Sequence, residues 1–235
     1  MINVTKYNAA YYQFKLMFEA CLGPLEDIHL NHDLKPAPYN TKGGIQDPDD
    51  NTFYGLIEKL FKEVVHNGWE FKLRWKEFQL KVLKPIFDEE KIVVQELPSI
   101  KIFPSGYEWL YVENPIERDG RTVNRHLDQE SPFYHPIFET TFILPLTDMD
   151  EDNGLFVGDE MYTNKYGEML YFNNIHHHGG YVYNRSKNSR VTLDFKALPH
   201  SKYDVNILTD KLIKKRGKLI EQKEFYRIGN YYTLI

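Results

Sequence analysis

Hydrophobic residues recur every three or four positions in the first 90 residues, a spacing that places them on one face of a helix. A stretch without this periodicity, residues 31–51, is rich in Pro, Gly, Asn and Asp and is typical of a loop. Gly23-Pro24 and His66-Asn67-Gly68 end two of the helical runs, and Pro85 lies near the end of the third. The pattern therefore predicts helices over residues 7–20, 52–65 and 69–88.

After residue 90 the pattern changes to short runs rich in β-branched and aromatic residues, separated by turn-forming clusters. Many short strands at near-even spacing, with no helices between them, favour an antiparallel double-sheet barrel over a parallel α/β sheet. The tail carries one more helical pattern and a possible last strand. The predicted elements are strands over residues 99–104, 139–146, 155–157, 168–172 and 190–198, a helix over 207–222 and a strand over 231–235.

This division predicts one domain of the mainly β class with flanking helices. Its parts are a helical front (1–90), a barrel core (91–199) and a tail of one helix and one strand (200–235). A chain of 235 residues is long enough to bury one sizeable core.

Charge and composition narrow the possible partners. The net charge of −5 and the lack of a long basic run make nucleic acid a poor partner. The single cysteine, Cys21, excludes an internal disulfide and a thiolate-rich metal site, and fits a reducing compartment. Neither a signal peptide nor an apolar run of about 18 residues is evident, so we expect a cytoplasmic protein without a membrane span. The oligomeric state stays open.

A candidate metal site begins with His126-Leu127-Asp128. Residues two apart on a strand point to the same face, so the imidazole of His126 and the carboxylate of Asp128 can reach one ion. A third imidazole from a distant strand completes the 2-His-1-carboxylate set, which covers one face of an octahedral Fe(II) and leaves three positions open. A zinc site is more often tetrahedral, with at most one open position.

The third imidazole is expected from the triplet at residues 176–178. In an extended segment, His176 and His178 share a face and His177 points the opposite way. His178 precedes Gly179, where the backbone can turn away from an ion, so His178 is the favoured ligand, with His177 next. The alternative for each piece taken alone is an exposed polar turn or a surface hydrogen bond.

Arg190 follows His178 by twelve residues and is a candidate anchor for an anion. A guanidinium binds a carboxylate through two parallel hydrogen bonds, a geometry that lysine cannot match. Thr192 lies two residues on and can donate its hydroxyl to the same carboxylate, while Thr141 and Tyr171 are weaker candidates for a further hydrogen bond. The alternative for Arg190 is an ion pair with a surface acid.

Over residues 98–199 these motifs resemble the 2-oxoglutarate- and Fe(II)-dependent oxygenase superfamily, and within it the StrG-type and phytanoyl-CoA-hydroxylase-like branch. The resemblance rests on the His126–Asp128 pair, on residues 139–147 (ETTFILPLT), on His178-Gly179 and Asn184, and on residues 189–195 (SRVTLDF). It implies a double-stranded β-helix, the jelly-roll fold also found in cupins, with the front helices packed on it.

The resemblance also implies a function. His126, Asp128 and His178 would bind Fe(II), and Arg190, helped by Thr192 and Thr141, would hold 2-oxoglutarate. The expected reaction uses O2 to hydroxylate a small polar metabolite such as an amino acid, a sugar or a natural-product intermediate. It releases succinate and CO2, and ascorbate would support the activity. Related halogenases carry a small residue in place of the carboxylate, so Asp128 favours hydroxylation.

Two other functions fit the same residues. One is a cupin-like isomerase or hydrolase that uses a metal without 2-oxoglutarate, and Arg190 distinguishes it from the oxygenase. The other is a jelly-roll module that binds a ligand without catalysis. The segments expected to cover the site are residues 105–121 and 129–138, whose aromatic residues suit a polar ring or an amino acid.

Overall fold

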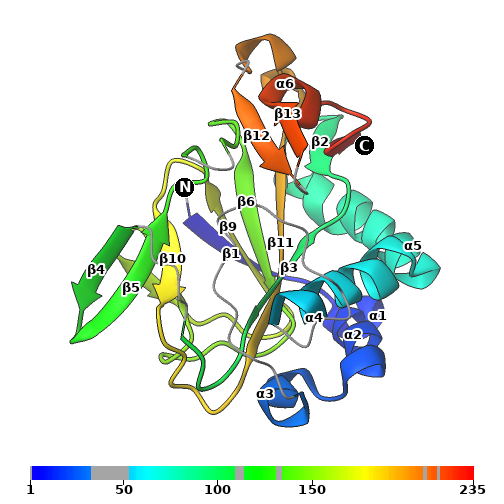
Figure 1. Cartoon of the computed structure of the whole chain (residues 1–235). Helices are drawn as coiled ribbons and strands as arrows, with labels where there is room; N and C mark the ends of the chain where they lie inside the picture. The colour runs from blue at the N-terminus through cyan, green and yellow to red at the C-terminus, as the bar shows by residue number, and fades with distance from the viewer. Residues whose placement is uncertain (1, 33–52, 109–113, 131–133, 209–210, 216–217) are drawn as a thin grey trace.

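The computed structural model of the protein describes residues 2–32, 53–108, 114–130, 134–208, 211–215 and 218–235. Within these residues the strands form a seven-stranded sheet, a five-stranded sheet and a separate two-stranded hairpin. Helices from the front of the chain lie on one side of the large sheet, and the small sheet lies on the other (Figure 1). None of the described helices is long and apolar enough to cross a membrane.

The large sheet has the strand order β1-β9-β6-β11, and β11 then pairs with both β3 and β2, which in turn pairs with β14. All of these pairs are antiparallel. Its strands are β1 (Ile2–Lys6), β2 (Ile92–Gln95), β3 (Ser99–Phe103), β6 (Thr140–Pro145), β9 (Glu168–Asn173), β11 (Arg190–Pro199) and β14 (Tyr232–Leu234).

The small sheet has the order β4-β5-β10-β7-β8, again antiparallel throughout. Between β3 and β11 the chain passes back and forth between the two sheets, which is the winding of a jelly roll. The strands of this sheet are β4 (Asn114–Arg118), β5 (Arg121–His126), β7 (Leu155–Val157), β8 (Glu160–Tyr162) and β10 (His178–Tyr181). The predicted strand-rich barrel with N-terminal helices is confirmed.

The helical front is also confirmed, with shorter and interrupted helices. The first predicted helix divides at Gln13, whose φ of 56° is left-handed and breaks the hydrogen-bond ladder. The second ends in π-helical turns, which are wider than those of an α-helix, and the third continues as π-helical turns and ends in a tighter 3-10 turn. The α-helices are α1 (Ala9–Tyr12), α2 (Phe14–Leu22), α3 (Ile28–Asn31), α4 (Phe53–Leu60), α5 (Trp69–Phe78) and α6 (Gln222–Phe225). The other helical turns are η1 (Leu25–Asp27), η2 (Phe61–His66), η3 (Gln79–Leu83), η4 (Lys84–Ile86), η5 (His200–Lys202) and η6 (Val205–Ile207).

The helix predicted over residues 207–222 is wrong. Its residues instead form a hairpin of β12 (Leu212–Lys215) and β13 (Lys218–Glu221), and only α6 begins at Gln222. Gly217, between the two strands, disfavours a continuous helix. The predicted last strand is confirmed as β14. Most of the predicted loop 31–51 lies outside the described residues.

Strand β11 separates an apolar layer from a polar one. Alternate residues point to opposite faces of a strand, and Val191, Leu193, Phe195 and Ala197 are fully buried in the large hydrophobic core. The ring of Phe195 lies edge-on to that of Trp75 in α5, with centroids 4.8 Å apart. The intervening residues of β11 therefore face the small sheet, across the interior of the barrel.

Candidate metal centre

Three side chains with metal-ligand chemistry meet at the ends of β5 and β10. These strands pair so that His126 lies directly opposite His178. Nε2 of His126 is 3.6 Å from Oδ1 of Asp128, and Nε2 of His178 is 3.6 Å from Oδ2 of the same carboxylate. One ligand atom from each residue lies within 4.8 Å of the other two, so a single ion can contact all three.

Asp128 reaches this position from a turn and not from the strand. β5 ends at His126, and Asp128 lies in the turn that follows. The backbone N–H of His135 donates to the carbonyl of Asp128 over 2.8 Å and so closes the loop around it. The expectation that both residues lie on one strand is therefore wrong, although their side chains converge as predicted.

The geometry favours His178 among the three consecutive histidines. Its side chain is buried, whereas His177 is exposed. Nδ1 of His178 lies 3.2 Å from the carbonyl of His176, an acceptor, so Nδ1 carries the proton and Nε2 presents its lone pair toward Asp128. Burial lowers the pKa of His178 to about 3, which leaves a neutral imidazole, the form that binds metals.

Asp128 is ionised in this setting. Burial by itself raises the pKa of a carboxyl group, but the ammonium of Lys196 holds the pKa of Asp128 well below its usual range. The carboxylate is thus an anionic ligand at neutral pH, and two imidazoles with one carboxylate suit a divalent ion such as Fe(II).

Arg190, the first residue of β11, faces β10 from across the barrel interior. A Cβ added to Gly180 would stand 3.3 Å from Nη1 of Arg190, and Gly180 shares a strand face with His178. Nη1 donates to the carbonyls of Asn153 and Gly154, over 2.6 and 2.9 Å. Burial lowers the pKa of the guanidinium to about 10, so it remains charged at neutral pH. The expected anion anchor therefore sits inside the barrel, held by backbone carbonyls, and not in a surface ion pair.

Of the other residues expected to contribute a hydrogen bond, two lie in the barrel interior and one does not. Thr141 on β6 has its Oγ1 3.1 Å from Oδ2 of Asp128 and belongs to the site. Thr192 faces the barrel interior beside Arg190, where its hydroxyl donates to Asp194 over 2.6 Å. Tyr171 was expected near the site, but its ring stacks on Phe142 with centroids 5.4 Å apart, on the helix-facing side of the sheet.

Lys196 on β11 was missed by the sequence reasoning, although a signal for it was present. Its ammonium contacts Oδ2 of Asp128 and lies 2.6 Å from Oγ1 of Thr141. Since Lys196 is six residues from Arg190, strand alternation places the two side chains on the same inner face. The available signal was the alternation in β11, where apolar residues occupy every second position and Lys196 stands at one of the positions between them.

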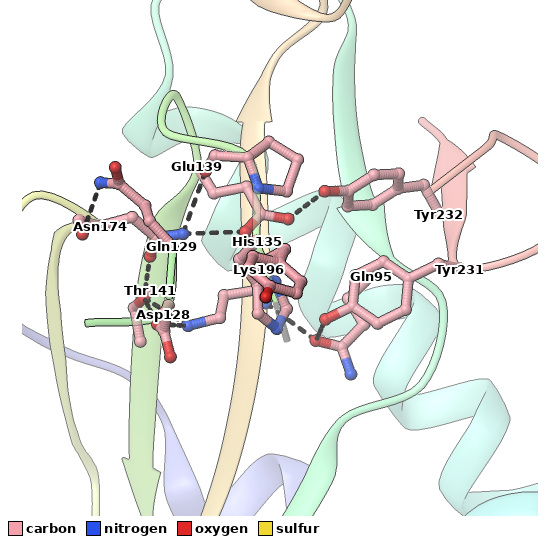
Figure 2. Close-up of polar contacts among 12 residues, drawn as sticks. Gln95, Asp128, Gln129, His135, Glu139, Thr141, Asn174, Lys196, Tyr231 and Tyr232 are labelled. Carbon is pink, nitrogen blue, oxygen red and sulfur yellow. Dashed lines mark hydrogen bonds and ion pairs between the residues drawn. The ribbon is translucent and has the colours of Figure 1, made fainter. Parts of the chain in front are cut away.

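A buried polar network extends from the centre toward the C-terminal strand (Figure 2). Thr141 is hydrogen-bonded to Oδ1 of Asn174, and Nδ2 of Asn174 donates to Glu139 over 2.9 Å. The carboxylate of Glu139 also accepts from Tyr232 on β14 and lies 2.9 Å from Nδ1 of His135. Burial, with the nearby Glu139 carboxylate, raises the pKa of Tyr232 well above its usual range, so the phenol keeps the proton that it donates.

Two segments expected to cover the site are only partly described. Residues 105–121 were expected as one loop, but Asn114–Arg118 form β4, which pairs with β5. Residues 109–113 and 131–133 lie outside the described part of the chain. Tyr134 is described: the ammonium of Lys211 lies 4.6 Å from its ring centroid, which links residues 129–138 to the base of the β12–β13 hairpin.

The chain is similar to a known protein over about half of its length. No protein-family model matches the chain. Over 110 residues, 47% of this chain, it is 35% identical to the streptomycin biosynthesis protein StrG of Streptomyces griseus. The match covers 50% of StrG, so the chain spans about half the length of this relative. The resemblance to StrG inferred from the motifs is confirmed.

Several solved structures are more distantly similar. SnoK, a non-haem α-ketoglutarate-dependent carbocyclase from nogalamycin biosynthesis, matches 84% of this chain and 79% of its own at 10% identity, with a TM-score of 0.42. HygX from Streptomyces hygroscopicus, solved with nickel and 2-oxoglutarate, matches 55% of this chain and 68% of its own at 13% identity, with a TM-score of 0.36. At these TM-scores and identities, the matches do not define the activity of this chain.

Proposed function

We propose that the protein is an Fe(II)- and 2-oxoglutarate-dependent dioxygenase that hydroxylates a small polar metabolite. The observation that carries the proposal is the convergence of His126, Asp128 and His178 at one point, with the guanidinium of Arg190 facing the same strand, β10, from across the barrel interior. An ion site and an anion anchor in one interior match a co-substrate that has both a metal-chelating end and a free carboxylate.

The donor set fits Fe(II). His126, Asp128 and His178 would hold the ion on one side and leave three positions for co-substrate and O2. Arg190, already charged and fixed by two carbonyls, would hold the distal carboxylate of 2-oxoglutarate and so orient its other end toward the ion. When bound, the iron supplies the oxidative chemistry that converts 2-oxoglutarate and O2 to succinate and CO2 and hydroxylates the substrate. Ascorbate would keep the iron reduced.

The proposed substrate class is supported by the StrG relation. The name of StrG places that protein in streptomycin biosynthesis, which favours a polar natural-product intermediate among the small metabolites considered. For this chain the substrate class is an inference from that relation and from the polar groups that face the barrel interior.

A succinate-release assay tests the proposal. Purified protein given Fe(II), ascorbate and 2-oxoglutarate is expected to form succinate, and a panel of amino acids, sugars and aminoglycoside-type compounds is expected to include one that accelerates succinate release. The hydroxylated product is then identified by a mass increase of one oxygen atom. A protein that binds neither iron nor 2-oxoglutarate would overturn the proposal.

We expect Arg190→Lys to raise the Kd for 2-oxoglutarate on the nickel-loaded protein by at least about tenfold while the affinity for nickel stays within about twofold. Lysine keeps the charge but loses the paired hydrogen bonds to a carboxylate. Calorimetric titration measures both constants. Arg121→Lys is the matched control, because Arg121 also donates to two backbone carbonyls, those of Asp152 and Tyr183, and its replacement should leave both constants unchanged. Unchanged 2-oxoglutarate binding in Arg190→Lys would favour a metal enzyme that does not use this co-substrate.

A further inference from the structure

Lys196 is a buried cation beside the candidate metal centre to which the proposed function assigns no role. Only 9% of its side chain is exposed. Its ammonium contacts Thr141, its partner on the neighbouring strand β6, and Asp128, which follows β5 of the opposite sheet (Figure 2). Lysine is almost never fully buried unless it is paired. Its position therefore requires an anionic partner, and Asp128 is that partner.

The hydrogen bonds around Asp128 assign Lys196 as the donor to one of its two carboxylate oxygens. The amide nitrogen of Asn174 donates to Glu139 and to the carbonyl of Pro136, so its oxygen faces Thr141 and needs a donor. A hydroxyl has one proton, and Thr141 gives it to Asn174. Oδ2 of Asp128 then takes its hydrogen bond from Lys196, and Oδ1, 3.6 Å from Nε2 of His126, is left for an ion.

We propose that Lys196 is a positioning residue that acts through the Asp128 carboxylate, and that its charge tunes the centre toward its anionic co-substrate. This inference rests on the proposed function. The ammonium repels a divalent cation that binds the same carboxylate, and it attracts a dianion that binds beside that cation. Because both interactions act across a buried interior, where charges are poorly screened, each changes an affinity substantially.

The two effects have opposite signs. Removal of the charge strengthens binding of the bare metal ion and weakens binding of 2-oxoglutarate to the metal-loaded protein. A residue that only supports the local packing would weaken both, because a loosened Asp128 is a poorer ligand and a loosened centre a poorer platform for the co-substrate. The sign of the change in metal affinity therefore separates a charge role from a packing role.

The test uses Lys196→Met and Lys196→Gln in the full chain, with nickel as a metal that air does not oxidise. Calorimetric titration first gives the nickel Kd of the apoprotein, then the 2-oxoglutarate Kd of the nickel-loaded protein. In both variants we expect the nickel Kd to fall about tenfold and the 2-oxoglutarate Kd to rise about tenfold. Lys196→Arg keeps the charge, so we expect neither the fall in the nickel Kd nor the rise in the 2-oxoglutarate Kd. Lys202→Met, at an exposed lysine, is the surface control.

The outcomes are distinct. Equal affinities in wild type and both neutral variants, or a nickel Kd that rises, would overturn the role of Lys196 and leave the proposed oxygenase function standing. A wild-type protein that binds neither nickel nor 2-oxoglutarate would overturn both. If Lys196→Met does not fold, the comparison of Lys196→Gln with Lys196→Arg carries the same test, because glutamine retains a hydrogen-bond donor without the charge.

Discussion

Replacement of Asp128 by alanine is expected to abolish both metal binding and succinate formation. The variant removes the single anionic member of the three-residue set, and two imidazoles 4.4 Å apart between ring centroids are left to hold the ion. Loss of a partner outside the ligand set typically costs 10–100-fold in metal affinity or activity, so loss of a ligand should cost more than about 100-fold. Metal content by mass spectrometry and succinate release measure the two losses.

The same substitution should also destabilise the apoprotein. Without Asp128, the ammonium of Lys196 is a buried cation that has lost its anionic partner, and such a loss costs about 3–5 kcal/mol of the free energy of unfolding. Asp128→Asn separates the two effects, since the amide oxygen still accepts from Lys196 but lacks the charge. Asp159→Ala is the control, because 88% of the Asp159 side chain is exposed. Succinate formation that persists in Asp128→Asn and Asp128→Ala would contradict the assigned role.

The second large effect is expected at Gly179. A Cβ added there would stand 1.8 Å from the carbonyl oxygen of Asn124 and 3.1 Å from the Cα of Arg125, both in the backbone of β5. Neither atom can move without separation of β5 from β10, the pair that brings His126 opposite His178. We expect Gly179→Ala to lower the free energy of unfolding by more than about 3 kcal/mol, and to weaken metal binding at the same time.

Urea denaturation measures the stability loss, and Gly180→Ala controls for a new methyl group in the same strand. A Cβ at Gly180 meets chiefly the movable end of the Arg190 side chain, at 3.3 and 3.4 Å. We expect a loss below about 1 kcal/mol for this variant. Equal losses in the two variants would show that the close approach of β10 to β5 is not what requires glycine at position 179.

Much of the barrel was predictable because its strands follow local rules. The runs at β3, β6, β7, β9 and β11 combine β-formers with flanking turn residues, and each was found within one or two residues. Among the strands that were missed, β1 and β4 are short edge strands that pair with β9 and β5, and β2 and β10 are four-residue strands inside their sheets. A partner strand far along the chain leaves no local pattern.

The same distinction applies to the candidate site. The convergence of His126, Asp128 and His178 was predictable, because the spacing of His126 and Asp128 and the triplet before Gly179 are local features. The polar groups around these residues were not, because Glu139, Asn174 and Lys196 acquire their roles through hydrogen bonds to residues 33 to 93 positions away. A hydrogen-bond network of this kind is a property of the assembled sheets.

The alternation along β11 has a consequence for how the chain finds its fold. A slip of one residue in the pairing of β11 with β6 would turn every side chain of the strand to the opposite face. Arg190 and Lys196 would then enter the aromatic layer beneath the helices. Arg190 would lose the carbonyls of Asn153 and Gly154, Lys196 would lose Asp128, and Phe195 would enter the polar interior. Both changes carry a large desolvation or burial cost. Arg190 and Lys196, the charged residues on the inner face of β11, thus also favour the correct strand register during folding.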